Sequence, residues 1–286
     1  MKHRSILFSF IIGLILMASM PLSAQRSGFP PEEFAQRRER LMKKIEHGMI
    51  MLFANTQANP AQRFRQDNDF YYFTGSEDQN AVLLMFPKSG RTLMFLPQKS
   101  TREEMYDGGN LLTDKYAQKK MGIDDYQPLS LLAEYIARIA GRIDNLVYIR
   151  LSGQDRVDGA RYEDFLFAGR RSRNPFNDQM SLDSFRIKIL SDKFPAFNFK
   201  DISPLIDEMR MIKSPREIEI LRRNGKLSAE AIKAAMQVTR HGVYEYELEA
   251  AAVHHILKFG ANGPAYASIV GSGPNSCVLH YEKSER

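Results

Sequence analysis

The stretch Arg65–Gly75 has the sequence RQDNDFYYFTG, and the organisation of the chain can be followed from it in both directions. Within it, Phe70–Thr74 contains only aromatic and β-branched residues, which are typical of a buried strand, so we predict a strand there. Before it, Met49–Ala54 is a short apolar run that predicts another strand. After it, Ala81–Phe86 and Thr92–Leu96 flank a Pro-Lys-Ser-Gly turn, which predicts a β-hairpin.

Helical patterns alternate with these strands. Pro30 and Pro31 precede two glutamates and an apolar stripe, which predicts the start of a helix. Leu129–Ile139 has helical periodicity, and Leu146–Ile149 returns to a strand pattern. We therefore predict an α/β domain over residues 25–204, with a mixed sheet flanked by helices.

The pattern becomes helical near residue 205. The sequence Ser-Pro-Arg-Glu at 214–217 is a capping-box signal for a long helix that ends near His241 and Gly242. A second helix is expected from Tyr244 to Phe259, with Gly260 at its end. Two short strands are then expected, at 269–270 and at 277–281, on either side of a glycine-rich turn.

The first 24 residues have the pattern of an export signal. Lys2 and Arg4 precede an apolar run that is short for a membrane span, and a small residue, Ala24, ends the segment. We expect cleavage near Ala24 and a mature protein in the periplasm or cell envelope, without stable membrane association. An uncleaved N-terminal anchor is the alternative.

The charge balance gives little support for nucleic-acid binding. The chain has 40 Lys and Arg against 34 Asp and Glu, a net charge of +6, and removal of Lys2 and Arg4 leaves +4. The basic clusters, interpreted as solvated faces, are Arg37, Arg38, Arg40, Lys43 and Lys44, and Arg170, Arg171 and Arg173. No nucleic-acid reader motif accompanies them, so we expect no nucleic-acid partner. The single cysteine, Cys277, excludes an internal disulfide and cysteine zinc modules, and we expect it to be buried.

Few residues suggest chemistry by themselves. His254 and His255 point about 100° apart on a helix, so they cannot bind one ion together. The Gly-Ser-Gly at 271–273 lacks the third glycine and the following helix of a dinucleotide-binding loop. His280 follows the glycine-rich turn and can face a cleft, although a core histidine is the alternative. The residues alone therefore indicate an exported α/β protein with a helical second segment.

Three stretches together resemble one superfamily. Arg65–Gly75 resembles the signature of the N-terminal domain of aminopeptidase P and its prolidase relatives. Met209–Ile218 resembles the beginning of the pita-bread catalytic domain of that superfamily. Ala265–Asn275, which leads into Leu279–Tyr281, is similar to the first active-site strands of that domain. The resemblance implies an Xaa-Pro aminopeptidase with an α+β pita-bread domain beginning at about residue 205.

The resemblance also implies a chemistry and a set of site residues. Members of the family are hydrolases with two divalent metal ions, usually manganese, and they act on peptides with proline in the second position. His280 matches a histidine that contacts substrate near the scissile bond. Tyr266 matches a tyrosine that hydrogen-bonds a carboxylate ligand of the metals. The family resemblance further implies a homo-oligomer, a dimer or a tetramer.

The sequence departs from the family in one respect. The family's metal ligands are two aspartates, a histidine and two glutamates, all beyond the stretch that matches Leu279–Tyr281. We therefore expect no metal ligand in residues 1–286 and no activity of this polypeptide alone. We also expect residues 205–286 to form only the first part of the pita-bread domain, with open strand edges near Ile269 and Leu279. Two alternatives stay open, which are a prolidase that cleaves only Xaa-Pro dipeptides and a non-catalytic pita-bread module that binds peptides or proteins.

Overall fold

The computed structural model describes residues 28–56, 63–151, 176 and 180–286. The predicted export segment and the cluster of Arg170, Arg171 and Arg173 lie outside the described residues. Within the described residues, no helix is both long and apolar enough to cross a bilayer.

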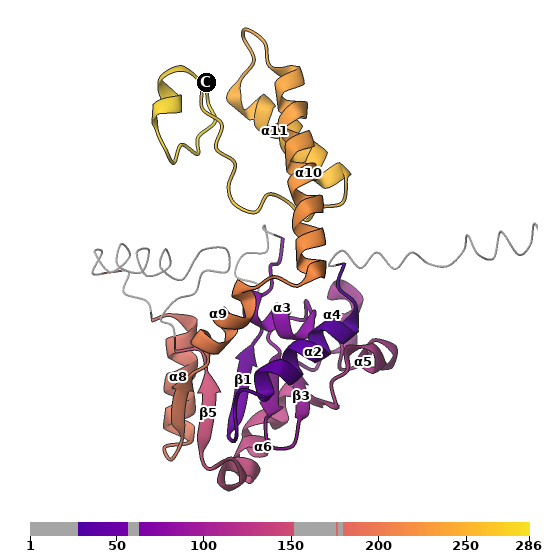
Figure 1. Ribbon diagram of the computed structural model, residues 1–286, viewed down its shortest axis with the longest axis vertical. Helices are drawn as coiled ribbons and strands as arrows, with labels where there is room; N and C mark the ends of the chain where they lie inside the picture. The colour runs from indigo at the N-terminus through magenta and orange to yellow at the C-terminus, as the bar shows by residue number, and fades with distance from the viewer. Residues whose placement is uncertain (1–27, 57–62, 152–175, 177–179) are drawn as a thin grey trace, which may run out of the picture.

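The centre of the described structure is a six-stranded sheet, and its mixed strand pairing is as predicted (Figure 1). Its strand order is β4-β3-β2-β1-β5-β6. The pairs β1–β2 and β2–β3 are antiparallel, and the pairs β1–β5, β3–β4 and β5–β6 are parallel. The strand bounds are β1 Met49–Phe53, β2 Val82–Phe86, β3 Arg91–Leu96, β4 Asp125–Pro128, β5 Leu146–Ile149 and β6 Asn198–Asp201.

Helices cover both faces of this sheet. Side chains alternate along β1, so Ile50 and Leu52 enter the cluster on one face, whereas Met49 and Met51 enter the cluster on the other. Because both faces are covered, β1 is apolar throughout. The first face is covered by α2 Pro31–Met42, α3 Asn68–Thr74, α5 Lys115–Met121 and α9 Ser203–Met211, and the second by α6 Leu132–Ile139 and α8 Leu182–Lys193. The remaining short elements of this part are α4 Thr101–Asp107, η1 Leu129–Leu131 and η2 Ala140–Ile143.

The prediction of a strand at Phe70–Thr74 is wrong, because these residues belong to the helix α3. The Asp67 carboxylate accepts hydrogen bonds from the backbone N–H groups of Asp69 and Phe70, which starts the helix. Gly75 ends it in the left-handed conformation, at φ +67°. The two helix-end signals outweigh the β propensity of the aromatic residues, which fill the core as helix side chains instead.

The interpretation of Arg37 and Arg38 as part of a solvated face is also wrong, because their exposed fractions are 3% and 1%. Arg38 donates to the carbonyl oxygens of Phe73 at 2.7 Å, Met121 at 2.8 Å and Gly122 at 2.6 Å. These carbonyls end α3 and α5, so one guanidinium caps both helices where their dipoles favour a cation. Burial lowers the pKa of Arg38 to about 10, so it stays charged at neutral pH.

Arg37 joins the sheet domain to the next helix. Its guanidinium lies 2.7 Å from Glu33 and 3.3 Å from Glu217, and it stacks 4.1 Å from the centre of the Tyr72 ring. The Ser214 hydroxyl also donates to Glu33 at 2.7 Å. The beginning of the long helix is thus fixed to α2 by charged groups with little exposure.

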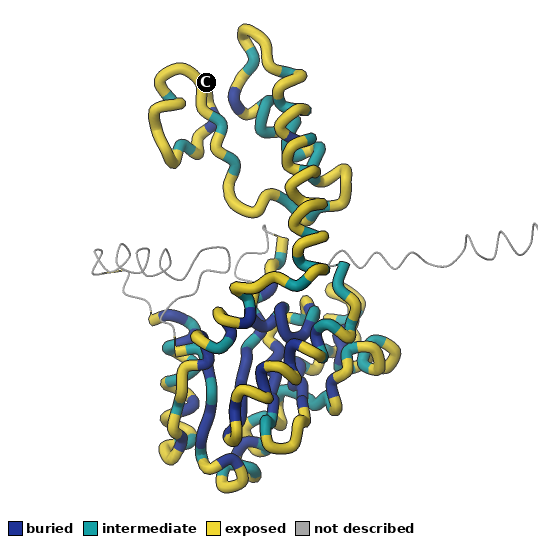
Figure 2. Tube along the Cα trace, viewed as in Figure 1, coloured by how far each residue is buried: buried dark blue, intermediate teal, exposed yellow. Residues whose placement is uncertain are grey.

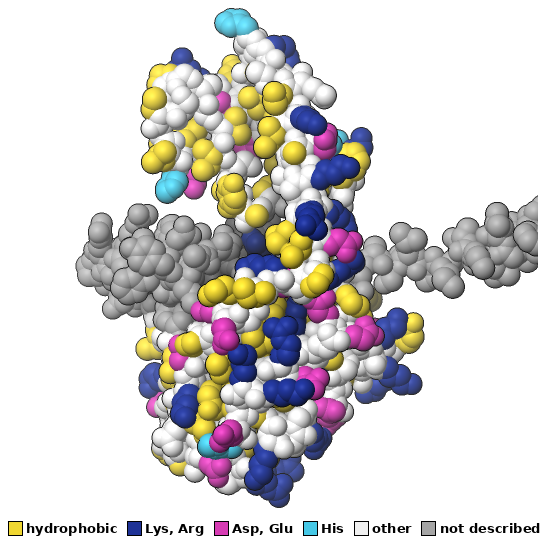
Figure 3. Space-filling model, in the orientation of Figure 1, with side chains coloured by type: hydrophobic (Ala, Val, Ile, Leu, Met, Phe, Trp, Pro, Cys, Tyr) yellow, Lys and Arg dark blue, Asp and Glu magenta, His cyan; other side chains and the backbone are white. Residues whose placement is uncertain are grey.

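The helical second segment has the predicted form. Helix α10 Pro215–Val238 begins with the expected capping box between Ser214 and Glu217, and α11 Glu245–Lys258 packs against it (Figure 1). Several apolar side chains of α10 are exposed, including Leu221 at 56% and Met236 at 67%. Figure 2 shows this exposure along the helix, and Figure 3 shows hydrophobic side chains gathered on this part of the surface.

The two strands predicted at 269–270 and 277–281 are absent from the described structure, and so are their open edges. The segment instead forms a short 3-10 helix, η3 Gly273–Cys277, between loops. Among the described residues no strand lies beside it, and its backbone forms local hydrogen bonds such as Asn275 N–H to the Ser272 carbonyl at 3.0 Å. Cys277 is exposed, contrary to the expectation of burial, because it lies on this loop and not in a strand.

Candidate functional site

The two predicted site residues lie on one segment, Asn262–Tyr281, which follows α11. Tyr266 is 74% exposed, and His280 is exposed in the turn after η3. No hydrogen bond or ion pair joins the two side chains in the described structure. The structure therefore places both residues on an accessible segment but does not bring them into contact.

The first end of this segment is held by the sheet domain. The Arg63 guanidinium donates to the carbonyl oxygen of Asn262 at 2.7 Å. Arg65 donates to the carbonyl oxygen of Ala265, next to Tyr266, at 3.1 Å. Arg65 is the first residue of the stretch that carries the resemblance, and its contact with the candidate site was not foreseen from the sequence.

The other end of the segment is held by Glu245, the first residue of α11. Its side chain is almost completely buried, and its carboxylate accepts hydrogen bonds from Ser272, Asn275, Tyr281 and the backbone N–H of Arg286. Burial opposes the charge, but these hydrogen bonds outweigh it and lower the pKa of Glu245 to about 2. Glu245 was not predicted as a site residue, because its only signal in the sequence is an acidic residue in the first turn of a helix.

A second network of buried charges lies within the sheet domain. Arg150, at the end of β5, contacts Asp67 at 2.9 Å, Asp69 at 3.5 Å and Asp183 at 2.5 Å, and Arg210 of α9 also contacts Asp69. Burial alone would lower the pKa of Arg150, but the three aspartates raise it. The network ties α3, α8 and α9 to the carboxyl end of β5, and each of its charges has a partner, which is typical of a structural role.

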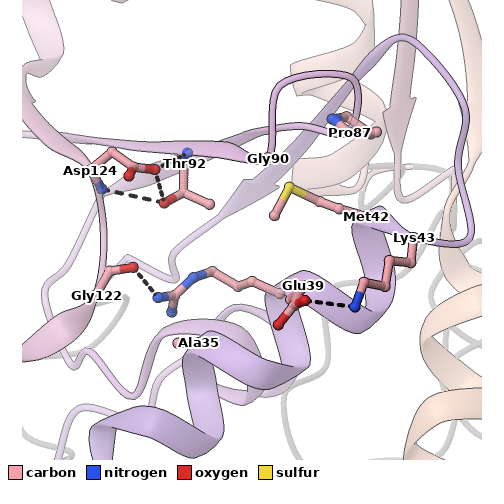
Figure 4. Close-up of a pocket in the computed structure, with 10 residues that line it drawn as sticks. Ala35, Glu39, Met42, Lys43, Pro87, Gly90, Thr92, Gly122 and Asp124 are labelled. Carbon is pink, nitrogen blue, oxygen red and sulfur yellow. Dashed lines mark hydrogen bonds and ion pairs between the residues drawn. The ribbon is translucent and has the colours of Figure 1, made fainter.

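A cavity of about 370 Å³ lies between α2, the β2–β3 turn and the loop after α5 (Figure 4). Its charged residues bind one another or the backbone. Lys43 pairs with Glu39 at 2.6 Å, and Asp124 accepts from the backbone N–H of Thr92 at 2.6 Å. Neither Tyr266 nor His280 lines this cavity, so it is separate from the candidate site.

The described residues do not fit a two-metal centre. They contain no group of three or more His, Cys, Asp or Glu side chains placed to hold a metal ion.

Comparisons with known proteins identify the family that the chain resembles along most of its length. Residues 34–148 match the model of the aminopeptidase P N-terminal domain, and residues 219–286 match that of metallopeptidase family M24. The chain is 31% identical over 262 residues to the Xaa-Pro aminopeptidase of Escherichia coli, covering 89% of this chain and 55% of that protein. It is 26% identical over 219 residues to the human Xaa-Pro dipeptidase, covering 76% of this chain and 39% of that protein.

The fold is similar to that of solved relatives as well. Zinc-substituted E. coli aminopeptidase P in complex with product has a TM-score of 0.69 and 28% identity to this chain. The match covers 90% of this chain and 56% of that one. The chain thus spans about half the length of the relatives and structures that it matches.

Proposed function

Because this chain belongs to the aminopeptidase P family of M24 metallopeptidases, we propose that the protein releases the N-terminal residue from peptides with proline in the second position. The observation that supports this most is the order of the matches, an aminopeptidase P N-terminal domain followed by M24 sequence, with 31% identity to an Xaa-Pro aminopeptidase. The proline of an Xaa-Pro bond has no backbone N–H, and its ring fixes φ, so cleavage of this bond needs a dedicated site.

We assign two roles within this function. His280 contacts the substrate near the scissile bond, and its exposure after η3 leaves its imidazole accessible to a peptide. Tyr266 orients a carboxylate ligand of the metals through its hydroxyl group, and it too is exposed. Both assignments follow the family motif at these positions.

The reaction is proposed to use two divalent metal ions, with manganese as the native metal. When bound, such a pair activates water and stabilises the charge that develops on the scissile carbonyl. The solved E. coli relative is zinc-substituted, so metal exchange is compatible with this fold. Residues 1–286 alone are proposed to hold no metal pair and to be inactive, because the family's ligands follow the motif that contains His280.

The second candidate is a prolidase, and the similarity to human Xaa-Pro dipeptidase supports keeping it. The two activities differ in substrate length. An aminopeptidase releases the first residue from a tripeptide with proline second, whereas a prolidase of this type cleaves only the dipeptide. The ratio of these two rates therefore separates the candidates.

We further propose that the protein is exported to the periplasm or cell envelope after cleavage near Ala24, without stable membrane association. It is proposed to work as a homo-oligomer, a dimer or a tetramer. Amino-terminal sequencing of the secreted protein tests the first proposal, and light scattering of the purified protein tests the second.

The enzymatic proposal is tested with two preparations, the product of the native gene and the polypeptide of residues 1–286. Each is incubated with an Xaa-Pro-Xaa tripeptide, an Xaa-Ala-Xaa tripeptide and an Xaa-Pro dipeptide, with and without manganese. The native product is expected to release the first residue from the proline tripeptide only, and only with metal. Peptide binding without cleavage would favour the binding module, and cleavage by residues 1–286 alone would overturn the assignment of the metal site.

A further inference from the structure

Glu245 is a buried carboxylate that is held by hydrogen bonds in the described part of the chain. Its exposed fraction is 1%, and no Lys or Arg side chain forms an ion pair with it in the described part of the chain. A buried carboxylate is costly unless hydrogen bonds replace its water. The structure supplies those hydrogen bonds, and all of their donors lie within Ser272–Arg286.

Both carboxylate oxygens of Glu245 accept more than one hydrogen bond. Oε1 accepts from the Ser272 backbone N–H at 2.6 Å, the Ser272 hydroxyl at 3.0 Å and the Asn275 amide at 3.1 Å. Oε2 accepts from the Tyr281 hydroxyl at 2.8 Å and the Arg286 backbone N–H at 3.0 Å. The Glu245 backbone N–H in turn donates to the Arg286 carbonyl at 2.7 Å. One side chain therefore binds both arms of the turn that contains His280.

The turn has few other means of holding its shape. It forms no strand, and its internal backbone bonds, such as Val278 N–H to the Asn275 carbonyl at 3.1 Å, each span only three residues. The Asn275 amide also donates to the Tyr281 hydroxyl at 2.9 Å, so Glu245, Asn275 and Tyr281 form a closed triangle. His280 is the residue immediately before Tyr281, so a peptide bond joins it to this triangle.

We propose that Glu245 is a positioning residue, which holds the turn Ser272–Tyr281 in one conformation and so presents His280 to the substrate. This inference rests on the proposed function only for its effect on catalysis. The chemistry is specific to a carboxylate of this length. A glutamine would place an NH₂ group against N–H and O–H donors, and an aspartate would be one methylene too short to reach both arms.

The first test measures the conformation of the turn and needs no enzymatic activity. Amide hydrogen exchange is followed by NMR in the wild-type chain, Glu245→Gln and the matched control Glu249→Gln, a partly exposed glutamate of the same helix. In E245Q, exchange at Ser272 and Arg286 is expected to accelerate about tenfold or more, the effect of losing a hydrogen bond to a charged group. The sheet domain and E249Q should keep wild-type rates. Unchanged exchange at Ser272 and Arg286 in E245Q would overturn the proposal.

The second test is a double-mutant cycle on the native gene product with the Xaa-Pro-Xaa tripeptide. E245Q is expected to lower kcat about tenfold or more, with a smaller change in KM. If Glu245 acts through His280, E245Q should cause little further loss in the His280→Ala background. Additive losses would contradict the positioning role, because a general effect on folding would persist without His280.

A milder variant covers the case in which E245Q does not fold. Ser272→Ala removes one hydroxyl donor and leaves the carboxylate and its other partners in place. It is expected to show the same non-additivity with His280→Ala on a smaller scale, and additivity would again refute the proposal. Absence of any Xaa-Pro activity in the wild-type protein would refute the proposed function instead, and the exchange experiment would still decide the role of Glu245.

Discussion

Replacement of Arg38 by methionine tests how the sheet domain is held together. Methionine keeps an unbranched apolar stem but removes the guanidinium, so the carbonyls of Phe73, Met121 and Gly122 lose their donor. Each of these hydrogen bonds to a charged group contributes about 1.5–3 kcal/mol, or about 4.5–9 kcal/mol for the three. The variant also avoids the cost of burying a cation. The depression of the Arg38 pKa from its usual value to about 10 sets that cost at about 3 kcal/mol.

The hydrogen bonds outweigh the burial cost, so Arg38→Met should lower the free energy of unfolding by about 1.5–6 kcal/mol. Urea unfolding followed by far-ultraviolet circular dichroism measures this, since the chain has no tryptophan to report on folding. Arg40→Met is the matched control, because Arg40 is exposed on the same helix and its loss should change the stability by less than about 0.5 kcal/mol. Equal stabilities of the two variants would refute the role of Arg38 as a shared helix cap.

Three further predictions concern single contacts. Gly75→Ala should destabilise the protein by about 1–3 kcal/mol, because φ at Gly75 is +67° and a Cβ there would overlap the Phe34 ring; a midpoint in urea equal to that of the wild type would contradict this. Arg65→Met should free the Ala265 carbonyl and lower kcat/KM of the native gene product with the Xaa-Pro-Xaa tripeptide about tenfold without changing global stability, and an unchanged kcat/KM would argue against it. Because the pKa of Glu245 is lowered to about 2, its stabilisation of the Ser272–Tyr281 turn should be complete above pH 4.5 and lost as the pH falls through about 2. The backbone amides of Ser272 and Arg286 should therefore stay protected from hydrogen exchange at pH 4, and protection that fades between pH 6 and 4 would refute this.

The elements that were predicted correctly are those with local signals. The capping box at Ser214 and Glu217 starts α10 as expected, since both partners lie within four residues of chain. The hairpin of β2 and β3 likewise follows from its turn and from the apolar runs on either side. These signals depend on neighbouring residues only, so no tertiary context can reverse them easily.

The two errors have different physical origins, local helix caps at α3 and tertiary contacts at Arg38. Phe70–Thr74 has the composition of a strand, but the cap at Asp67 and the left-handed Gly75 make it a helix whose aromatic side chains the core can accept. The position of Arg38 in a basic cluster suggested solvent, whereas its partners lie 35 to 84 residues away. Neither outcome is encoded in the local composition.

The candidate site was predicted in part. Tyr266 and His280 were nominated by their place in a family motif, and their roles stay predictions. The side chains that hold their segment, Arg65 and Glu245, were not nominated, because their contacts span 200 and up to 41 residues of chain. The expected strands around His280 failed for a related reason, since a strand requires a neighbour and none lies beside this segment in the described structure.

The most direct test of this account is cleavage of an Xaa-Pro-Xaa tripeptide by the native gene product, followed by mass spectrometry with manganese or with a chelator. The account predicts release of the first residue with manganese, loss of that release with the chelator, and no cleavage of the matched Xaa-Ala-Xaa peptide. Intact proline tripeptide after prolonged incubation with manganese, or equal cleavage of both peptides, would contradict it.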